Sequence, residues 1–429
     1  MIKILDSKLK NFDINLDKLL SQRKNKIQLS AVSVTKIIND VKKNGDKAIL
    51  KYEKRFNKNN IIVPSLKQIT KSIASLDKKV KKAIDLAYNR IYKFHSLQKF
   101  KNISYSDKLQ NKLEYKYIPI ESVAIYVPGS SASYPSSVLM NAIPALVAGV
   151  KRIIMINPGK KGKQNPAVLY AARKCKIKEI YSIGGPSAIA AVAYGSKKIK
   201  KVDKIVGPGN SYVVAAKKEV FGDVGVEGMI AGPSEITIVC DKFSKPEWIA
   251  SDLIGQAEHS ELSECILISK NKNIIKKVND EIIKQLKELP RAAIAKKSIL
   301  TNGILIHITS NKKIIDVINK IAPEHLELNI KNYKKIVNKI KNAGSICLGK
   351  YAIMAMTDYG VPGSNHVLPT NSSSRYSSGL SVSDFNKKIS YINLSKKGIE
   401  TLGPSAITLA NYEGLAGHAK SVELRIRRK

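Results

Sequence analysis

The sequence predicts an α/β protein in which two successive units each contain a parallel sheet with helices on both faces. From about residue 120, short apolar runs alternate with apolar or amphipathic segments of helical length. The alternation restarts near residue 235, whereas the first 110 residues lack it. A chain of 429 residues is also too long for one hydrophobic core and suggests roughly two to four domains.

Residues 1–110 are rich in lysine and are expected to be helical. Apolar residues recur at spacings of three and four in residues 33–43 and 65–100, the pattern of amphipathic helices that bury one face. No catalytic combination of residues occurs here, so we expect this region to support the rest of the fold.

The first α/β unit is predicted from about residue 120. Its expected strands are 122–127, 152–156, 179–183 and 204–206, and its expected helices are 137–148, 167–174, 187–194 and 212–220. Glycines follow three of these strands, at Gly129, Gly184–Gly185 and Gly207–Asn210. Ligands of such sheets bind where the strands end, and glycine lets a phosphate or ribose approach the backbone closely. The GxGxxG fingerprint is absent, so these glycines can equally serve tight turns.

The second α/β unit is predicted from residue 235. Its expected strands are 235–239, 265–268 and 304–308, its expected helices are 247–256, 274–286 and 314–321, and residues 333–340 continue the alternation. Residues 349–386 are dense in Gly, Ser, Pro and Asn, and a loop of this length is usually functional or disordered. Because it contains Asp358 and His366, we favour a functional loop. A strand and helices are expected over about 390–426.

The composition of 43% hydrophobic and 25% charged residues is typical of a soluble globular protein. A net charge of +40 raises the hypothesis of nucleic-acid binding. However, the lysines are spread over the polar faces of expected helices, and neither zinc-finger spacing nor an aromatic RNA-binding motif occurs. We therefore expect no nucleic-acid partner.

The sequence carries no signal for export or membrane insertion. Its N-terminus lacks the apolar core of a signal peptide. Its longest apolar run, Val138–Val150, is shorter than the about 20 residues that span a bilayer. The four cysteines form no CxxC pair and lie in or beside apolar stretches, which indicates buried free thiols in a reducing compartment. We expect a cytoplasmic protein without a membrane partner.

Four of the six histidines lie near a carboxyl or amide side chain, and all four follow residue 250. Histidine is the side chain that most readily transfers protons or binds metals near neutral pH. We therefore expect a site in this part of the chain, whereas His307 lies in an apolar run and is interpreted as structural. The four neighbourhoods are Gln256 with His259, Glu324 with His325, Asp358 with His366, and Glu413 with His418.

Each neighbourhood also has a purely structural interpretation. Gln256 and His259 share a helical face and could hold one ion, yet a histidine at a helix end can contact carbonyl groups instead. The pair Glu324–His325 could act as acid and base or lie on the surface. Asp358 and His418 are side chains that suit Zn²⁺, but spacing alone does not show that they converge. HExxH is absent, which argues against a zinc protease.

Taken together, these segments resemble the histidinol dehydrogenase family from about residue 30 to the C-terminus. The presence of several motifs in one order makes the resemblance highly specific. The motifs are YVPG at 126–129, VDKIVGPGN at 202–210, AGPSE at 231–235, QAEH at 256–259, APEHL at 322–326, SNHVLPT at 364–370 and SSGLSV at 377–382.

The resemblance implies an NAD-dependent, zinc-containing oxidoreductase that converts L-histidinol to L-histidine through L-histidinaldehyde, the last two steps of histidine biosynthesis. The implied fold is two incomplete Rossmann-like, doubly wound domains with a helical N-terminal region and a smaller C-terminal extension. The family forms a homodimer in which the C-terminal segment completes the partner's active site. The implied divisions are 1–114 for the helical region, 115–240 and 241–348 for the two domains, and 349–429 for the active-site loop and dimerisation extension.

The resemblance also implies roles for individual residues. His325 would take the proton from the alcohol, and Glu324 would activate the water that attacks the aldehyde. One Zn²⁺ per subunit would be held by Gln256, His259, Asp358 and His418. The substrate would be bound by these four ligands with Ser234, His325, His366 and Glu413, and NAD would contact Tyr126, Ser187 and Asn210.

Four positions depart from the family's pattern. The glutamate expected before the loop aspartate is Met354, and the stretch 358–366 is one residue longer. Residues 226–229 contain an extra glycine, and an expected cofactor-contacting glutamine is Ser187. These differences leave open a second interpretation, a paralogue that oxidises another small amino or hydroxy alcohol to its acid.

Overall fold

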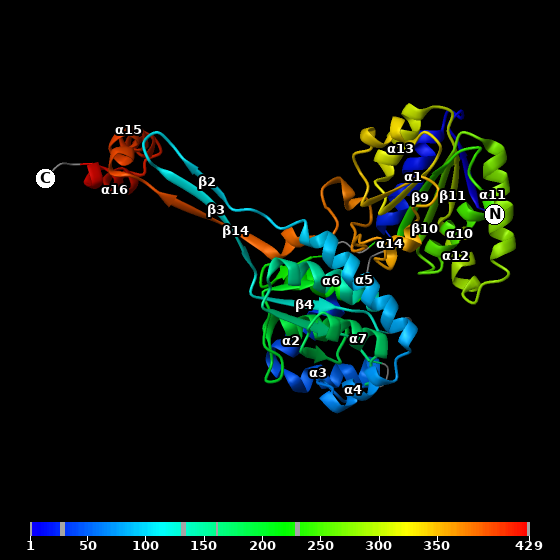
Figure 1. Ribbon diagram of the computed structural model, residues 1–429, viewed down its shortest axis with the longest axis horizontal. Coiled ribbons are helices and arrows are strands. Elements are labelled where there is room, and N and C mark those ends of the chain that lie inside the picture. Colours follow the sequence, from blue (N-terminus) through cyan, green and yellow to red (C-terminus); the bar gives the residue numbers. More distant parts are fainter. Residues whose placement is uncertain (1, 26–30, 130–133, 160–161, 228–231, 427–429) are drawn as a thin grey trace.

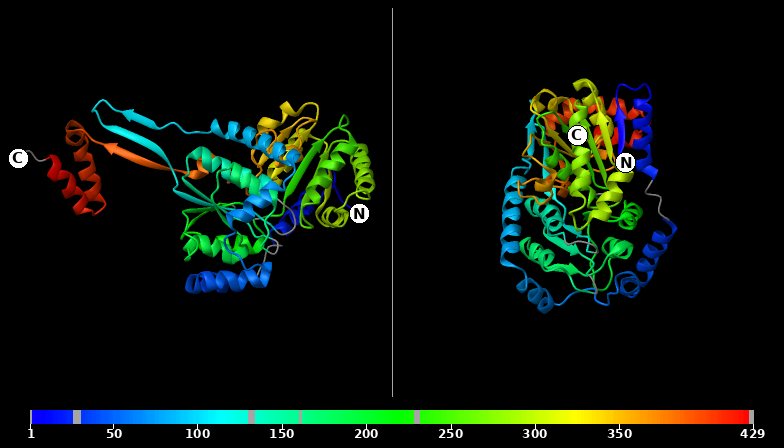
Figure 2. Two further views of the ribbon diagram at one scale, coloured as in Figure 1. Left: turned by 60° about the horizontal axis from the view of Figure 1, so that its bottom comes forward. Right: turned by 90° about the vertical axis from the view of Figure 1, so that its right-hand side faces the viewer.

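The computed structural model describes residues 2–25, 31–129, 134–159, 162–227 and 232–426. Two bodies, each built around a parallel sheet, lie beside one another, and a narrow arm extends away from them (Figure 1). Two further views show the same arm, with the C-terminus at its far end (Figure 2). The predicted α/β class with parallel sheets is therefore confirmed.

The first body contains a five-stranded parallel sheet in the order β6-β5-β4-β7-β8. Apolar runs of strand length are buried on both faces of such a sheet, and the first four strands lie where the sequence predicts them. The strands are β4 (Ser122–Tyr126), β5 (Arg152–Ile156), β6 (Glu179–Tyr181), β7 (Lys204–Val206) and β8 (Gly225–Val226). The connecting helices are α6 (Pro135–Ala148), α7 (Pro166–Lys174), α8 (Gly185–Tyr194) and α9 (Ser211–Val220).

Alternate side chains of β4 belong to the cores on the two faces of this sheet. Val123 and Ile125 belong to a core shared with α6 and α7, whereas Ala124 and Tyr126 belong to a core shared with α8 and α9. Helices from the N-terminal region complete both cores, which confirms their predicted supporting role. They are α2 (Ala31–Asn44), α3 (Asp46–Tyr52), η1 (Glu53–Asn57), α4 (Leu66–Ala74) and α5 (Lys78–Ser96).

The longest apolar run of the sequence forms α6. This helix begins with Pro135, at a position where the missing N–H of proline costs nothing. It ends at Gly149, whose φ of 96° lies in the left-handed region that glycine tolerates. Among the residues that the structure describes, no helix is long and apolar enough to cross a membrane.

The second body contains a six-stranded parallel sheet in the order β1-β11-β10-β9-β12-β13. Helices α10, α11 and α12 cover one face, and α1 and α13 cover the other. The strands are β1 (Lys3–Asp6), β9 (Glu235–Cys240), β10 (Glu264–Ser269), β11 (Ile304–His307), β12 (His325–Asn329) and β13 (Ser345–Leu348). The helices are α1 (Phe12–Asn25), α10 (Pro246–Ala257), α11 (Lys272–Gln285), α12 (Ala292–Asn302) and α13 (Asn311–Ile321).

The N-terminal segment differs from the expectation of a wholly helical region. Lys3–Asp6 forms the edge strand β1, which pairs in parallel with Ile304–His307 of β11. Four residues are too few for a clear strand pattern, and β11 supplies the hydrogen bonds that hold them extended. Residues 333–340 also differ, because they form only the short turns η2 (Tyr333–Lys335) and η3 (Val337–Lys339). The domain boundaries themselves stay predictions.

The arm joins two segments that are far apart in the sequence. Strands β3 and β14 pair antiparallel over their full eight residues, and β2 lies on the other side of β3. The arm elements are β2 (Ile103–Ser106), β3 (Lys112–Pro119), β14 (Asn386–Asn393), α15 (Lys396–Tyr412) and α16 (Ala416–Ile426). Its exposed apolar side chains include Ile103, Tyr105, Leu113, Tyr115, Ile392, Leu402, Leu409, Tyr412 and Leu424.

The segment 349–386 contacts both bodies, and its functional role stays a prediction. Asn365 Nδ2 donates to the Met140 carbonyl of the first body at 2.7 Å. The backbone N–H of Asn371 donates to Glu235 Oε1 of the second body at 2.8 Å. Its regular elements are short: α14 (Met354–Asp358), η4 (Ser373–Arg375) and η5 (Val382–Phe385).

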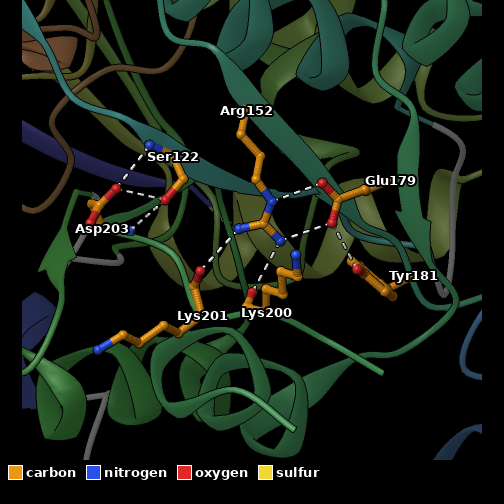
Figure 3. A network of polar contacts seen from close by, with 7 residues as sticks. All are labelled: Ser122, Arg152, Glu179, Tyr181, Lys200, Lys201 and Asp203. Atoms are coloured by element: carbon orange, nitrogen blue, oxygen red, sulfur yellow. Dashed lines mark hydrogen bonds and ion pairs between the residues drawn. The ribbon is translucent and has the colours of Figure 1, made fainter. Parts of the chain in front are cut away.

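A polar network stabilises the amino-terminal edge of the first sheet (Figure 3). The Arg152 guanidinium donates to both carboxylate oxygens of Glu179 at 2.8 Å and to the carbonyls of Lys200 and Lys201. A bidentate pair of this kind fixes the orientation of both side chains. The network lies at the opposite end of the strands from the glycine turns, so it organises the sheet rather than the candidate site.

Candidate active site

The second body and its loop bring together four of the residues singled out in the sequence, Glu324, His325, His259 and Asp358, and Gln256 lies three positions before His259. Glu324 precedes β12 and His325 begins it, Gln256 lies in the last turn of α10 and His259 just beyond it, and Asp358 ends α14. Their backbones are held by three separate elements, so their convergence is a tertiary feature. The site lies at the amino-terminal ends of β9 and β12, where the loop 349–386 passes between the two bodies.

Distances between the ionisable groups define the centre of this site. His325 Nε2 lies 3.7 Å from Asp358 Oδ1 and 3.8 Å from Glu324 Oε1. His259 Nε2 lies 3.8 Å from Asp358 Oδ2. Asp358 thus lies between two imidazoles, at separations slightly longer than a direct hydrogen bond.

Two buried polar atoms in the site have no hydrogen-bond partner among the described residues. They are Gln256 Oε1 and His325 Nδ1, on side chains whose residues are only 1% and 3% exposed. A buried oxygen or nitrogen without a partner is costly and often marks a bound ion, water or ligand. An amide oxygen and an unprotonated imidazole nitrogen both carry a lone pair, which is what metal ligation or the acceptance of a proton requires.

Burial determines the protonation of the histidines. It lowers the pKa of His325 to about 3, with the nearby His366 and His259 adding to the effect. It lowers the pKa of His366 to about 4. It also lowers the pKa of His259, although 40% of that side chain's surface is exposed. These imidazoles are therefore neutral near pH 7, the form that accepts a proton or ligates a metal.

The carboxyl groups of the site shift in the opposite direction. Burial raises the pKa of Glu324 well above its ordinary value, although its Oε2 accepts a hydrogen bond from the Glu235 N–H at 2.9 Å. Burial also raises the pKa of Asp358 to about 7. A carboxyl group with a raised pKa is a stronger base once it is ionised. The Glu324 carboxylate is therefore suited to abstract a proton from water.

The arrangement suits a divalent metal with nitrogen and oxygen ligands. Gln256, His259 and Asp358 offer one amide oxygen, one imidazole nitrogen and one carboxylate, and the unpartnered Gln256 Oε1 fits such a role. Within the described part of the chain, no three His, Cys, Asp or Glu side chains form a metal-binding group.

His366 is bonded to the backbone of the same loop. Its Nδ1 donates to the Asp358 carbonyl at 2.5 Å, which fixes the ring and leaves Nε2 for another partner. The adjacent Asn365 side chain contacts His95 Nε2 at 3.3 Å, and His95 Nδ1 contacts Gln98 Oε1 at 2.8 Å. His95 thus supports the loop from α5, a role that its sequence neighbourhood does not indicate.

The three candidate cofactor residues lie at the carboxyl ends of strands in the first body. The Tyr126 hydroxyl, at the end of β4, accepts a hydrogen bond from the Gly185 N–H at 3.1 Å. Asn210 caps α9 through the Val213 N–H at 3.1 Å and is exposed. Ser187 is buried, and its hydroxyl donates to the Gly184 carbonyl at 3.1 Å.

Sequence analysis did not identify Lys217, which lies beneath the Gly207–Asn210 turn. Its Nζ is fully buried and donates to the carbonyls of Gly207 at 2.5 Å and Glu227 at 2.9 Å. Burial lowers its pKa to about 7. Lys217 and Lys218 look alike as helix-surface lysines in the sequence, and no local pattern singles out Lys217 as the buried one.

The remaining candidates are Ser234, which adjoins the cluster in the sequence, and the arm residues Glu413 and His418. Ser234 lies half-buried just before β9, and its carbonyl accepts from the Glu264 N–H at 3.0 Å. Glu413 ends α15 and His418 lies in α16, and both are exposed on the arm, far from the bodies (Figure 1). A single chain therefore does not unite His418 with Asp358.

The unusual residues of the sequence have different environments. The Met354 side chain is 2% exposed and packs in the hydrophobic core of the second body with α10 and α11. It therefore points into the core rather than into the site. The extra glycine, Gly228, lies outside the described residues.

Comparisons with known proteins agree with one another. The family model described as histidinol dehydrogenase matches residues 20–426. A histidinol dehydrogenase of Pelagibacter ubique is 83% identical over 429 residues, covering 100% of both chains. One from Nitrosomonas europaea is 43% identical, covering 99% of this chain and 100% of its own. The crystal structure of histidinol dehydrogenase from Elizabethkingia anophelis is 37% identical with a TM-score of 0.93, covering 99% and 98% of the two chains.

Proposed function

Since the chain belongs to the histidinol dehydrogenase family and is an oxidoreductase, we propose that it oxidises L-histidinol to L-histidine through L-histidinaldehyde. The proposed cofactors are one Zn²⁺ per subunit and two molecules of NAD⁺ per turnover. The observation that carries the proposal is the convergence of His259 and Asp358 beside the buried pair Glu324–His325, with the buried Gln256 Oε1, which has no partner among the described residues, three positions before His259.

His325 is the proposed base of the alcohol oxidation. Its neutral, buried imidazole takes the hydroxyl proton of the substrate while a hydride leaves the adjacent carbon. An ionised carboxylate at Asp358 or Glu324, 3.7 Å and 3.8 Å from His325 Nε2, would favour the imidazolium that results.

Glu324 is the proposed base of the second oxidation. Its high pKa lets it take a proton from the water that adds to the aldehyde carbon. The hydrated aldehyde then loses a second hydride and a proton to give the carboxylic acid. The hydrogen bond from the Glu235 N–H holds one carboxylate oxygen, so the other can face the reacting water.

Zinc, when bound, would fix the substrate and polarise it, and NAD⁺ would accept the hydrides. Gln256, His259 and Asp358 would hold the metal on this chain, and a divalent charge there would favour ionised Asp358. Ser234 and His366 would contact the substrate. Tyr126, Asn210 and the backbone near Ser187 would contact NAD, because they lie at the strand ends where dinucleotides bind.

A second copy of the chain is proposed to complete the site. The arm exposes many apolar side chains, and large exposed apolar patches usually mark protein interfaces. A homodimer that covers this surface would let the partner subunit's arm bring its own His418 and Glu413 to the cluster. His418 would then be a fourth protein ligand of the metal.

No observation favours the alternative of a paralogue with another alcohol substrate. Its main motivation was Met354 in place of the expected glutamate, and this side chain is buried in the core. The four cysteines are free and buried, which supports a reducing compartment such as the cytoplasm.

The direct test is to load the purified protein with zinc and supply NAD⁺ with L-histidinol. We expect about two NADH per L-histidine formed, and loss of activity on chelation that zinc restores. Turnover of another small alcohol without any turnover of L-histidinol would reject the proposed substrate.

A further inference from the structure

A buried carboxyl pair, Asp252 and Glu327, lies next to the candidate metal site without a role in the proposed mechanism. Glu327 follows His325 by two residues on β12, so both side chains point to the same face of the sheet. Asp252 precedes Gln256 by four residues on α10, so these two share one helical face. The carboxyl groups of Asp252 and Glu327 are close enough to each other that each shifts the pKa of the other.

Glu327 also binds the start of the helix that carries Asp358. The Met354 N–H, at the first position of α14, donates to Glu327 Oε1 at 2.7 Å in a buried environment. α14 has only five residues and ends at Asp358. A helix this short is not stable by itself, so its position depends on contacts such as this one.

We propose that Asp252 and Glu327 are positioning residues that place Asp358 relative to Gln256 and His259. Through its carboxylate, Glu327 connects β12 to α14, and Asp252 of α10 lies beside that carboxylate. The inference rests on the proposed function, because it assumes that these side chains bind a metal. It deepens that function by assigning residues that set the geometry of the ligands without touching the metal.

The energetics of the pair support a specific role. Burying two carboxyl groups is costly, and an apolar pair of the same size would fill the core at lower cost. Burial raises the pKa of both groups, and the neighbouring Asp252 raises that of Glu327 further. Glu327 Oε1 accepts from the Met354 N–H, whereas its buried Oε2 has no hydrogen-bond partner among the described residues.

Two variants each remove the hydrogen bond between Glu327 and the Met354 N–H, one by changing the acceptor and the other by changing the donor. Glu327→Leu removes the acceptor, and Glu327→Gln is its control because it keeps an oxygen acceptor and a donor for Asp252. Met354→Pro removes the donor at a helix position that tolerates proline, after the extended residue Ile353. Met354→Ala is its control, because it also loses the Met354 side chain but keeps the N–H.

The readout is the zinc dissociation constant, measured by competition with a chromophoric chelator, together with the absorption spectrum of the Co²⁺-substituted protein. We expect the dissociation constant to rise about tenfold or more in Glu327→Leu and Met354→Pro, with an altered Co²⁺ spectrum. The two controls should stay within about threefold of the wild type. Val278→Ala, in the same core but on α11, should lower the melting temperature without changing zinc affinity.

The outcomes separate the inference from the proposed function. A wild-type protein that binds no zinc contradicts the proposed function itself. A wild type that binds zinc while Met354→Pro and Met354→Ala bind it equally well overturns only the inference. The Met354 comparison decides the question if Glu327→Leu does not fold.

Discussion

At the scale of single residues, the environment of a side chain decides its chemistry more than its identity does. His325 and His307 are both buried histidines. His307 Nδ1 is paired with Asp6 at 3.0 Å and its Nε2 with the Lys270 carbonyl at 3.2 Å, so both ring nitrogens are used, in line with a structural role. His325 Nδ1 has no partner among the described residues, and His325 Nε2 faces Asp358 and Glu324. Of these two histidines, only His325 has ring nitrogen atoms available for a substrate.

His325→Ala is therefore expected to lower turnover by about 10²- to 10⁴-fold, the usual contribution of a general base, while the protein stays folded. Steady-state NADH formation and circular dichroism measure the two effects. His307→Ala is the matched control and should show the reverse, with lower thermal stability and nearly normal turnover. Comparable turnover in the two variants would remove His325 from the chemistry.

At the scale of elements, periodic apolar segments were predictable and short connecting elements were not. The strands of the first sheet and its helices lie where the sequence indicated, because burial on both faces demands uninterrupted apolar runs. Strand β12 has the sequence HLELN, and all five residues are buried. Because the polar residues His325 and Glu327 are among them, the strand lacks the apolar run that marks a buried strand in a sequence. Strand β1 and helix α14 are held by Ile304–His307 and Glu327, which no local pattern can reveal.

The turn between β7 and α9 gives a prediction at this scale. Gly207 has φ 102°, and an added Cβ would lie 2.2 Å from the Tyr126 carbonyl oxygen. Gly207→Ala should therefore cost roughly 1–3 kcal/mol of folding free energy and weaken NAD binding, since Tyr126 and Asn210 would move apart. Denaturant unfolding and NAD titration measure these effects.

Gly222→Ala is the control for this prediction. Gly222 has a similar φ of 105°, but an added Cβ would meet nothing within 4 Å. In Gly222→Ala the free energy of unfolding should fall only by the cost of the strained backbone, and the NAD affinity should stay unchanged. Equal NAD affinity in the two variants would contradict a cofactor role for the Gly207 turn.

At the scale of the whole molecule, the arm separates residues that one chemical function needs together. His418 lies in α16 and Glu413 directly follows α15 at the end of the arm, whereas Gln256, His259 and Asp358 belong to α10, the turn after it and α14 of the second body (Figure 1). The apolar surface of the arm and this separation both point to an assembly with shared sites.

Mixing two inactive variants tests this assembly. A mixed dimer of His325→Ala and His418→Ala subunits would contain one complete site, formed by the core of the second and the arm of the first. With random pairing, the mixture should recover about a quarter of wild-type turnover. Mixed dimers that are detected by mass but remain inactive would refute a site shared in this way.

The sequence by itself determined the α/β class, the order of most strands and helices, and the residues worth testing, because burial periodicity and side-chain chemistry are local properties. Gln256, His259, Glu324, His325 and Asp358 were singled out by their chemistry, but only the tertiary structure brought them together, since their spacing of up to about 100 residues carries no distance information. The tertiary structure alone also exposed His418 on the arm and buried Lys217, Glu327 and Met354. Burial depends on what packs from other elements, and a side chain's own sequence neighbours do not record that.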